Sequence, residues 1–191
     1  MKKLGILLMV LGALLMTGAG GLYVHNSREN LEAGAASQEM LLEAVRTLDA
    51  ADDREAEIRT EMTVKAVDGL PCIGVLSIPA IQRELPVLAD WSYPELRKAP
   101  CRYTGSTFTD NLIIAAHNYR RHFGYISRLQ PGDDVYFTDM DGLTTAYSVV
   151  DTETIMGTDV EAMTETDADL SLFTCTYGGR SRITVRCERV Y

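Results

Sequence analysis

The sequence predicts a mainly β domain, built as a closed barrel or a sandwich, behind a helical N-terminal region. Two observations carry this prediction. Short apolar segments recur from residue 72 onward with turn residues between them. Before them, a long uncharged run is followed by a stretch rich in Ala, Leu, Met and Glu. We therefore expect three parts: residues 1–25, residues 26–65, and a β domain of residues 66–191.

The first part predicts a membrane anchor or a signal segment. No charged residue interrupts the run from Leu4 to Val24, which is long enough to cross a bilayer core of about 30 Å as a helix. Lys2 and Lys3 precede the run and favour a cytoplasmic N-terminus. The alternative is a cleaved signal peptide, because small residues follow in "TGAGG". Both interpretations place the rest of the chain outside the cytoplasm.

The second part, residues 26–65, predicts a helical stalk. Leu41, Val45 and Leu48 recur at helical spacing and form a narrow apolar stripe rather than a full core face. A solvated helix that holds the domain away from the membrane is the expected structure. A helix packed against the domain and a partner-binding coil are the alternatives.

The third part contains about eight expected strands and only short helices. Helical candidates are "YPELRKA" at 93–99 and "YRRHFGYISRL" at 119–129. So many short strands in one domain favour a barrel or a sandwich. The expected strands are 72–79, 84–88, 101–105, 111–117, 133–139, 146–154, 169–175 and 181–190.

Composition excludes several classes of function. The net charge of -9 argues against a nucleic-acid binder, which needs a basic surface. The spacing of Cys72, Cys101, Cys175 and Cys187 fits no metal cage, and no phosphate-binding glycine loop is present. A disulfide among Cys72, Cys101 and Cys187 is compatible with an extracellular location, but nothing selects a pair. We expect no cofactor; the acidic "DMDG" at 139–142 could hold calcium, although a turn is the expected structure.

Three residues could form a site for acyl transfer. His117 ends one expected strand, Cys175 ends another, and Arg182 opens the strand after it. A hairpin could bring Arg182 near Cys175, where a cation favours a thiolate and could hold an oxyanion. The thiolate would attack a peptide carbonyl, and the imidazolium would protonate the leaving amine. Taken singly, Cys175 is expected to be a packing residue, and His117 and His122 to be structural or surface histidines. His25, beside the uncharged run, is expected to have no role.

These motifs, taken together, resemble the sortases, the membrane-anchored cysteine transpeptidases of mainly Gram-positive bacteria. "LSLFTC" is similar to their Thr-Leu-x-Thr-Cys signature, with Ser171 in the first Thr position. "NLIIAAHN" resembles the strand that ends in their histidine, and "SRITVRC" the strand that their arginine opens. The resemblance covers residues 70–191 and includes the order His, Cys, Arg.

The resemblance implies an eight-stranded β-barrel and a specific role for each site residue. Cys175 would be the nucleophile, and His117 the general acid and then the base. Arg182, with Arg180 as the fallback, would stabilise the oxyanion, and Thr174 would bind substrate beside the nucleophile. The reaction would cleave a Leu-Pro-x-Thr-Gly-like sorting signal and hold the acyl part as a thioester. An amine of the cell wall or of a pilin would then accept the surface protein.

The residues leave the sortase class and two rival functions open. The His117-Asn118 pair and the N-terminal helical region are similar to class B, but the long helix that class B carries before its cysteine strand has no room here. One rival is an anchored β-domain that binds a surface partner without catalysis. The other is a different Cys-His peptidase, although papain-like enzymes place the cysteine before the histidine.

Overall fold

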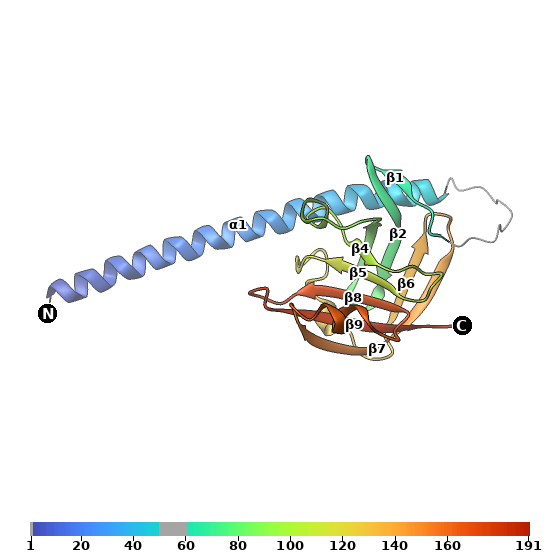
Figure 1. Cartoon of the computed structure of the whole chain (residues 1–191). Helices are drawn as coiled ribbons and strands as arrows, with labels where there is room; N and C mark the ends of the chain where they lie inside the picture. The colour runs from blue at the N-terminus through green and yellow to red at the C-terminus, as the bar shows by residue number, and fades with distance from the viewer. Residues whose placement is uncertain (1, 50–60) are drawn as a thin grey trace. The chain divides into compact units, whose positions relative to one another are not determined.

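The computed structural model describes residues 2–49 and 61–191 (Figure 1). The chain divides between Glu32 and Ala33 into two compact units. The helices are α1 (Lys2–Asp49), η1 (Pro79–Ile81), α2 (Tyr93–Leu96), η2 (Ile126–Arg128) and α3 (Val160–Thr164). The strands are β1 (Lys65–Val67), β2 (Leu70–Ile78), β3 (Arg83–Leu88), β4 (Cys101–Thr104), β5 (Leu112–Ala116), β6 (Asp134–Asp139), β7 (Thr144–Met156), β8 (Leu170–Cys175) and β9 (Ser181–Arg189).

The described part of the first unit consists of α1 residues up to Glu32. Its large apolar side chains, including Met9, Leu14 and Met16, are exposed. Within residues 2–49 and 61–191, we find no helix that is long and apolar enough to cross a membrane. The prediction of a membrane-spanning segment from Leu4 to Val24 is therefore not confirmed.

The remainder of α1, residues 33–49, belongs to the same unit as the β domain. Its buried positions Ala33, Ser37, Met40 and Ala44 follow one another at helical spacing. Met40 and Ala44 share a buried cluster with barrel residues. The expectation of a solvated stalk is wrong for this segment, because one face of the helix packs on the barrel. Its small side chains allow this close packing although they form no strong apolar stripe. The division at residues 1–25, 26–65 and 66–191 otherwise stays a prediction.

The strands of the second unit form one closed sheet. Their order is β1-β2-β3-β4-β5-β8-β9-β7-β6, and β2 also pairs with β6. Because that pairing joins the far end of the sheet to β2, strands β2 to β9 close into an eight-stranded barrel, as Figure 1 lets the reader follow. The eight strands expected from the sequence correspond to these eight, and α3 is the only helix of the short β7–β8 connection.

Alternation of side chains separates an inner from an outer core. The inner core contains residues such as Leu76, Phe137 and Tyr147, all fully buried. On β8, Leu170 and Leu172 belong to this inner core. Neighbouring side chains of a strand point to opposite faces, and a second cluster accordingly lies on the outer face, where α1, α2 and α3 contribute side chains.

A short ninth strand, β1, pairs only with β2 among the described residues. The two strands are joined by Asp68 and Gly69, whose φ angles are 50° and 72°. Asp-Gly with two positive φ angles is the preferred two-residue hairpin connection. The carboxylate of Glu43 in α1 accepts a hydrogen bond from the backbone N–H of Asp68 at 2.9 Å, so this hairpin is tied to the docked part of the helix.

Candidate active site

Three neighbouring strands, β5, β8 and β9, carry the predicted site residues at adjacent positions. Cys175 is the last residue of β8, and its cross-strand partner on β9 is Arg182. On the other side, β5 runs parallel to β8, with Ala116 paired to Thr174. His117 and Cys175 are the residues that directly follow this pair. The register therefore brings all three predicted side chains to one end of the barrel wall.

The three side chains also share the outer face of the barrel. On β8, Leu172 belongs to the inner core and Phe173 to the outer cluster, so Cys175 lies on the outer side. Arg182 shares that side because cross-strand partners project to the same face. The same alternation along β5 places His117 there. All three residues are half-buried, and each is thus partly open to solvent.

Cys175 differs from the other cysteines in accessibility. All four cysteines are free thiols, and Cys72, Cys101 and Cys187 are completely buried. Burial raises the pKa of Cys72, and it raises the pKa of both Cys101 and Cys187 to about 12. These three thiols act as small core side chains. Cys175 is the only cysteine that solvent reaches.

The hydrogen bonds of Arg182 fix its guanidinium beside the β8–β9 turn. Its Nη1 donates to the carbonyl oxygens of Gly179 at 2.9 Å and Ser181 at 3.1 Å. Gly157, just after β7, lies close by: a Cβ there would sit 2.8 Å from the same Nη1. Arg180 lies in the exposed turn, outside β9, and its carbonyl oxygen accepts from the N–H of Gly157 at 2.9 Å. The register thus pairs Cys175 with Arg182 rather than with the fallback, Arg180.

A short chain of tilted ring contacts connects His117 to the docked part of α1. The ring of Tyr119 lies 4.9 Å from the ring of His117 and 5.5 Å from that of His122. His122 is completely buried, and its Nε2 lies 3.3 Å from the carbonyl oxygen of Ala33. Burial, the largest cause, lowers the pKa of His122 to about 4. His122 is thus a core residue. Its position in a loop did not allow the sequence to distinguish a buried histidine from a surface one.

The neutral state of His122 predicts a loss of stability in acid. Its pKa is about 4 in the folded chain against 6.5 for an ordinary histidine, so the unfolded chain binds the extra proton between these values. This contribution is complete above pH 6.5 and is lost as the pH falls toward 4, by about 3 kcal/mol in total. We expect His122→Phe to flatten the dependence of unfolding free energy on pH in this window. Urea denaturation of both proteins across the window measures it, and parallel curves would contradict the assignment.

Thr174 lies beneath the site rather than in its open face. It is 2% exposed, and its Oγ1 donates a hydrogen bond to the carbonyl oxygen of Ala116 at 2.8 Å. This bond joins the ends of β8 and β5 directly before Cys175 and His117. The position differs from the predicted substrate-lining one because alternation turns Thr174 inward. The substrate-binding role stays a prediction.

Removing the Thr174 hydroxyl should weaken the fold at this junction. Thr174→Val leaves a buried carbonyl without its donor, which costs about 1–2 kcal/mol of unfolding free energy. Thr184→Val is the matched control, because the Thr184 hydroxyl is buried and has no hydrogen-bond partner among the described residues. Chemical denaturation of both variants measures the difference. Equal losses in the two variants would contradict a bracing role for Thr174.

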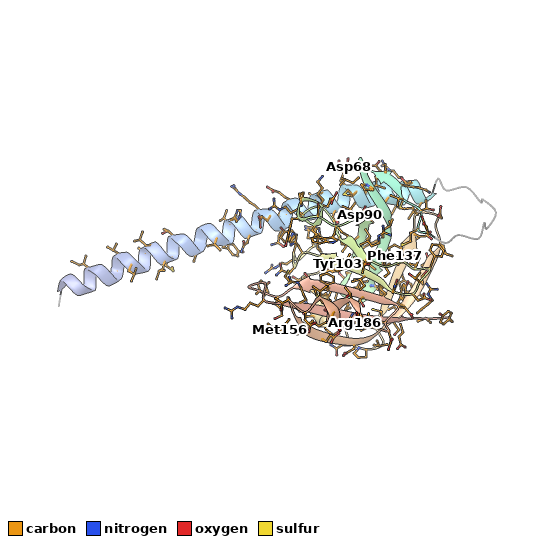
Figure 2. The ribbon with its side chains drawn as sticks, viewed as in Figure 1. Asp68, Asp90, Tyr103, Phe137, Met156 and Arg186 are labelled. Carbon is orange, nitrogen blue, oxygen red and sulfur yellow. The ribbon has the colours of Figure 1, made fainter. Side chains whose placement is uncertain are left out.

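Arg186 is a buried residue of this face that sequence reasoning missed. It is 7% exposed, and its Nε donates to the carboxylate of Glu153 at 2.8 Å. Its Nη1 donates to the Ser171 hydroxyl at 2.9 Å, and its remaining bonds reach the carbonyl oxygens of Ala162 and Met163 in α3. Figure 2 labels Arg186 on the barrel wall. The only signal was an arginine between apolar residues of "ITVRC".

An aromatic group, also missed, extends the outer face from Phe173. The Tyr103 ring meets the Phe173 ring edge-on at 5.2 Å and stacks on the Trp91 ring at 5.6 Å (Figure 2 labels Tyr103). Trp91 is 43% exposed. A groove of about 410 Å³ runs beside Trp91 and Tyr103 and is also lined by Asp90 and Arg102. The exposed part of this group is the Trp91 ring, which Tyr103 connects to the buried ring of Phe173, two residues before Cys175 on β8.

The acidic loop after β6 forms a turn. Asp139 Oδ1 accepts hydrogen bonds from the backbone N–H groups of Asp141 and Leu143, both at 2.9 Å. Within residues 2–49 and 61–191, no group of three His, Cys, Asp or Glu side chains is arranged to hold a metal ion.

Comparison with known proteins identifies the family. The Sortase domain model matches residues 76–190, which is more than half of the chain. A Streptococcus pneumoniae sortase C is 28% identical with a TM-score of 0.56, over 80% of this chain and 89% of that one. A Streptococcus agalactiae sortase C1 is 27% identical with a TM-score of 0.54, over 62% and 67% of the two chains. A Clostridium perfringens sortase D5 transpeptidase is 18% identical, covers 82% and 99%, and shares the fold with a TM-score of 0.66.

No curated protein matches the chain. The family model nevertheless spans β5, β8 and β9 completely, and with them the paired strand ends at His117, Cys175 and Arg182. The prediction drawn from the sequence motifs is confirmed at the level of family and barrel: the chain belongs to the sortase family.

Proposed function

We propose that the chain is an extracytoplasmic cysteine transpeptidase that cleaves a Leu-Pro-x-Thr-Gly-like sorting signal and transfers the acyl part to an amine. The observation that carries this proposal is the strand register, which sets Cys175 opposite Arg182 on β9. On the other flank, β5 ends one residue before His117. This register supports a site in which Cys175 would be the nucleophile, His117 the acid–base group and Arg182 the cation.

The reaction follows from the chemistry of these three groups. The Cys175 thiolate attacks the carbonyl carbon of the scissile peptide bond, and a C–S bond forms. His117 in its imidazolium form gives a proton to the leaving nitrogen, the C–N bond breaks, and the acyl part remains as a thioester. An incoming amine then attacks the thioester and gives its proton to His117, and Cys175 leaves as the thiolate.

Arg182 would stabilise the negative charge that develops on the carbonyl oxygen. Nη1 is held by the carbonyl oxygens of Gly179 and Ser181, and N–H groups on the other nitrogens are left to donate to an oxyanion. Donors that are fixed before the reaction stabilise a transition state without reorganisation. The exposed ring of Trp91 and the face around Phe173 would receive apolar side chains of the peptide.

A pilin lysine is the acceptor that similarity favours. The S. pneumoniae sortase C is a protein whose structure bears on catalysis and on pilin substrate specificity, and it is 28% identical to this chain. An amine of the cell wall is the alternative acceptor within the same mechanism. Both acceptors require a catalytic domain outside the cytoplasm.

Attachment to the membrane through Leu4–Val24 belongs to the same proposal. Its support is the uncharged run behind Lys2 and Lys3. If the run anchors the chain, the full-length protein should stay in the membrane fraction after alkaline carbonate washing. Release of a shortened chain into the medium would instead indicate a cleaved signal peptide.

Intact mass spectrometry of the full-length protein tests the transpeptidase proposal. The protein is incubated with a panel of sorting-signal peptides, first without an acceptor and then with lysine-bearing pilin peptides or a wall-type amine. We expect a mass gain equal to the acyl fragment, which the added amine removes. An intact protein mass that never changes with any peptide would instead favour a binding domain without catalysis.

Gly157 allows the role of Arg182 to be tested without removing its charge. A Cβ at Gly157 would crowd Arg182 Nη1, so Gly157→Ala should displace the guanidinium. We expect a fall of about tenfold or more in kcat, since small misplacements of catalytic groups have effects of this size. Steady-state kinetics of Gly157→Ala, Arg182→Ala and the double variant measure it. The Gly157 effect should vanish in the Arg182→Ala background; additive effects would contradict the mechanism.

A further inference from the structure

A second cleft is lined by none of the residues Cys175, His117 and Arg182. Its volume is about 420 Å³, and residues 34–41 of α1, the start of β3 and the loop after His117 line it. Three of its residues are arginines, Arg83, Arg120 and Arg121, against the single carboxylate of Glu84. In a chain with a net charge of -9, this is a local concentration of positive charge.

Arg83 is held rigidly at this cleft by neutral partners. Its Nε and Nη2 donate to the carbonyl oxygen of Arg120 at 3.2 and 2.7 Å, and its Nη1 donates to that of Gln82 at 2.7 Å. A guanidinium has five N–H groups, so two remain available. No carboxylate among the described residues forms an ion pair with Arg83 or Arg121. Arg83 also lies over the Tyr125 ring, 5.6 Å from its centroid, so its position is fixed by neutral groups that leave its charge available to an anion.

The α1 side of the cleft contributes a buried hydroxyl, Ser37, and a glycine, Gly34, that Arg121 approaches closely. Ser37 is 3% exposed, and its Oγ finds no hydrogen-bond partner among the described residues. A buried hydroxyl without a partner is unfavourable, and a ligand in the cleft would relieve this cost. On the same helix, Gly34 is crossed by the Arg121 side chain so closely that a Cβ at Gly34 would overlap the Arg121 Cδ. The glycine thus lets Arg121 reach over the helix.

We propose that this cleft binds a phosphate-bearing anion. The guanidinium fork matches phosphate oxygens with two parallel hydrogen bonds, and several converging cations favour a multiply charged group over a single carboxylate. The headgroup of an anionic lipid and a soluble phosphate compound share this chemistry. The site is independent of Cys175, so it can exist whether or not the transpeptidase proposal holds.

Calorimetric titration of the full-length chain in a non-ionic detergent, with inorganic pyrophosphate as the probe, tests the proposal. We expect saturable binding that weakens about tenfold or more in Arg121→Gln and in Arg83→Gln, since each variant removes a charge-assisted hydrogen bond. Arg97→Gln is the matched control: Arg97 is an exposed arginine outside the cleft, and its loss should leave the affinity unchanged. Binding should persist in Cys175→Ala.

Gly34→Ala provides a test that removes no charge. Alanine stabilises a helix by about 1 kcal/mol relative to glycine, but here it would displace Arg121 from the cleft. We expect pyrophosphate affinity to fall severalfold, and thermal unfolding of the variant checks that it is folded at the temperature of the titration. Unchanged affinity in both Gly34→Ala and Arg121→Gln, or heats that never saturate, would overturn the proposal.

Two doped detergents distinguish the source of the phosphate. Micelles containing phosphatidylglycerol are compared with micelles containing a fatty acid at the same fraction of negative charge. A lipid-headgroup ligand predicts that only phosphatidylglycerol raises the apparent Kd of pyrophosphate. A soluble phosphate ligand predicts that both kinds of micelle leave the apparent Kd of pyrophosphate the same. The comparison is made with wild type, after pyrophosphate binding has been shown to depend on Arg121.

Discussion

Replacing Cys175 by alanine should abolish the thioester adduct and lower peptide turnover by more than about 10⁴-fold, because the nucleophile is lost. The β8 strand should persist, since Cys175 is half-buried and its neighbours Phe173 and Thr174 supply the buried contacts. The expected result is thus a folded, inactive protein. Intact mass spectrometry with a sorting-signal peptide measures the adduct, and far-UV circular dichroism checks the fold.

Alkylation of the native protein provides the control for this prediction. Iodoacetamide should label one thiol, Cys175, because Cys72, Cys101 and Cys187 are completely buried. The labelled protein should lose activity like Cys175→Ala, whereas Cys101→Ala should keep its adduct chemistry. An adduct that survives in Cys175→Ala would contradict the assignment of the nucleophile.

The strands β2 to β9 could be predicted from the sequence because each is a short apolar segment bounded by turn residues. The sequence analysis missed β1, although Asp68-Gly69 is a strong hairpin signal. The strand before this turn has only three paired residues, which is too short for a recognisable apolar pattern. Closure of the barrel depends on the pairing of β2 with β6, which joins residues far apart in the chain. No local pattern in either strand specifies that partner.

The motifs predict candidate site residues, but not the residues that pack around them. Cys175, His117 and Arg182 stand at strand ends that the sequence marks with turns. Burial of His122 and Arg186 depends on which elements cover them, and a linear pattern cannot supply that information. Docking of α1 was only an alternative to the solvated stalk for a related reason, since alanine, glycine and serine do not produce an apolar stripe.

Arg186 offers the largest expected effect on stability. Its guanidinium joins β9 to Glu153 on β7, to the Ser171 hydroxyl on β8, and to the end of α3 through the carbonyl oxygens of Ala162 and Met163. Arg186→Met keeps much of the side-chain volume but removes every one of these donors. Buried acceptors that lose a charged donor are strongly destabilising.

We expect Arg186→Met to lower the free energy of unfolding by about 3 kcal/mol, the lower part of the range for a broken buried pair, since the Glu153 side chain is 40% exposed and can be hydrated. Urea denaturation measures the loss, with Arg97→Met as a control that removes an exposed arginine. Combining Arg186→Met with Ser171→Ala should cost less than the two single losses together, because one bond is counted twice. Arg186 binds α3 to the same wall that carries Cys175, and Met163 of α3 also packs in the outer cluster. A loss no larger than that of Arg97→Met would mean that packing of Met163, rather than this hydrogen-bond network, holds α3 beside the site.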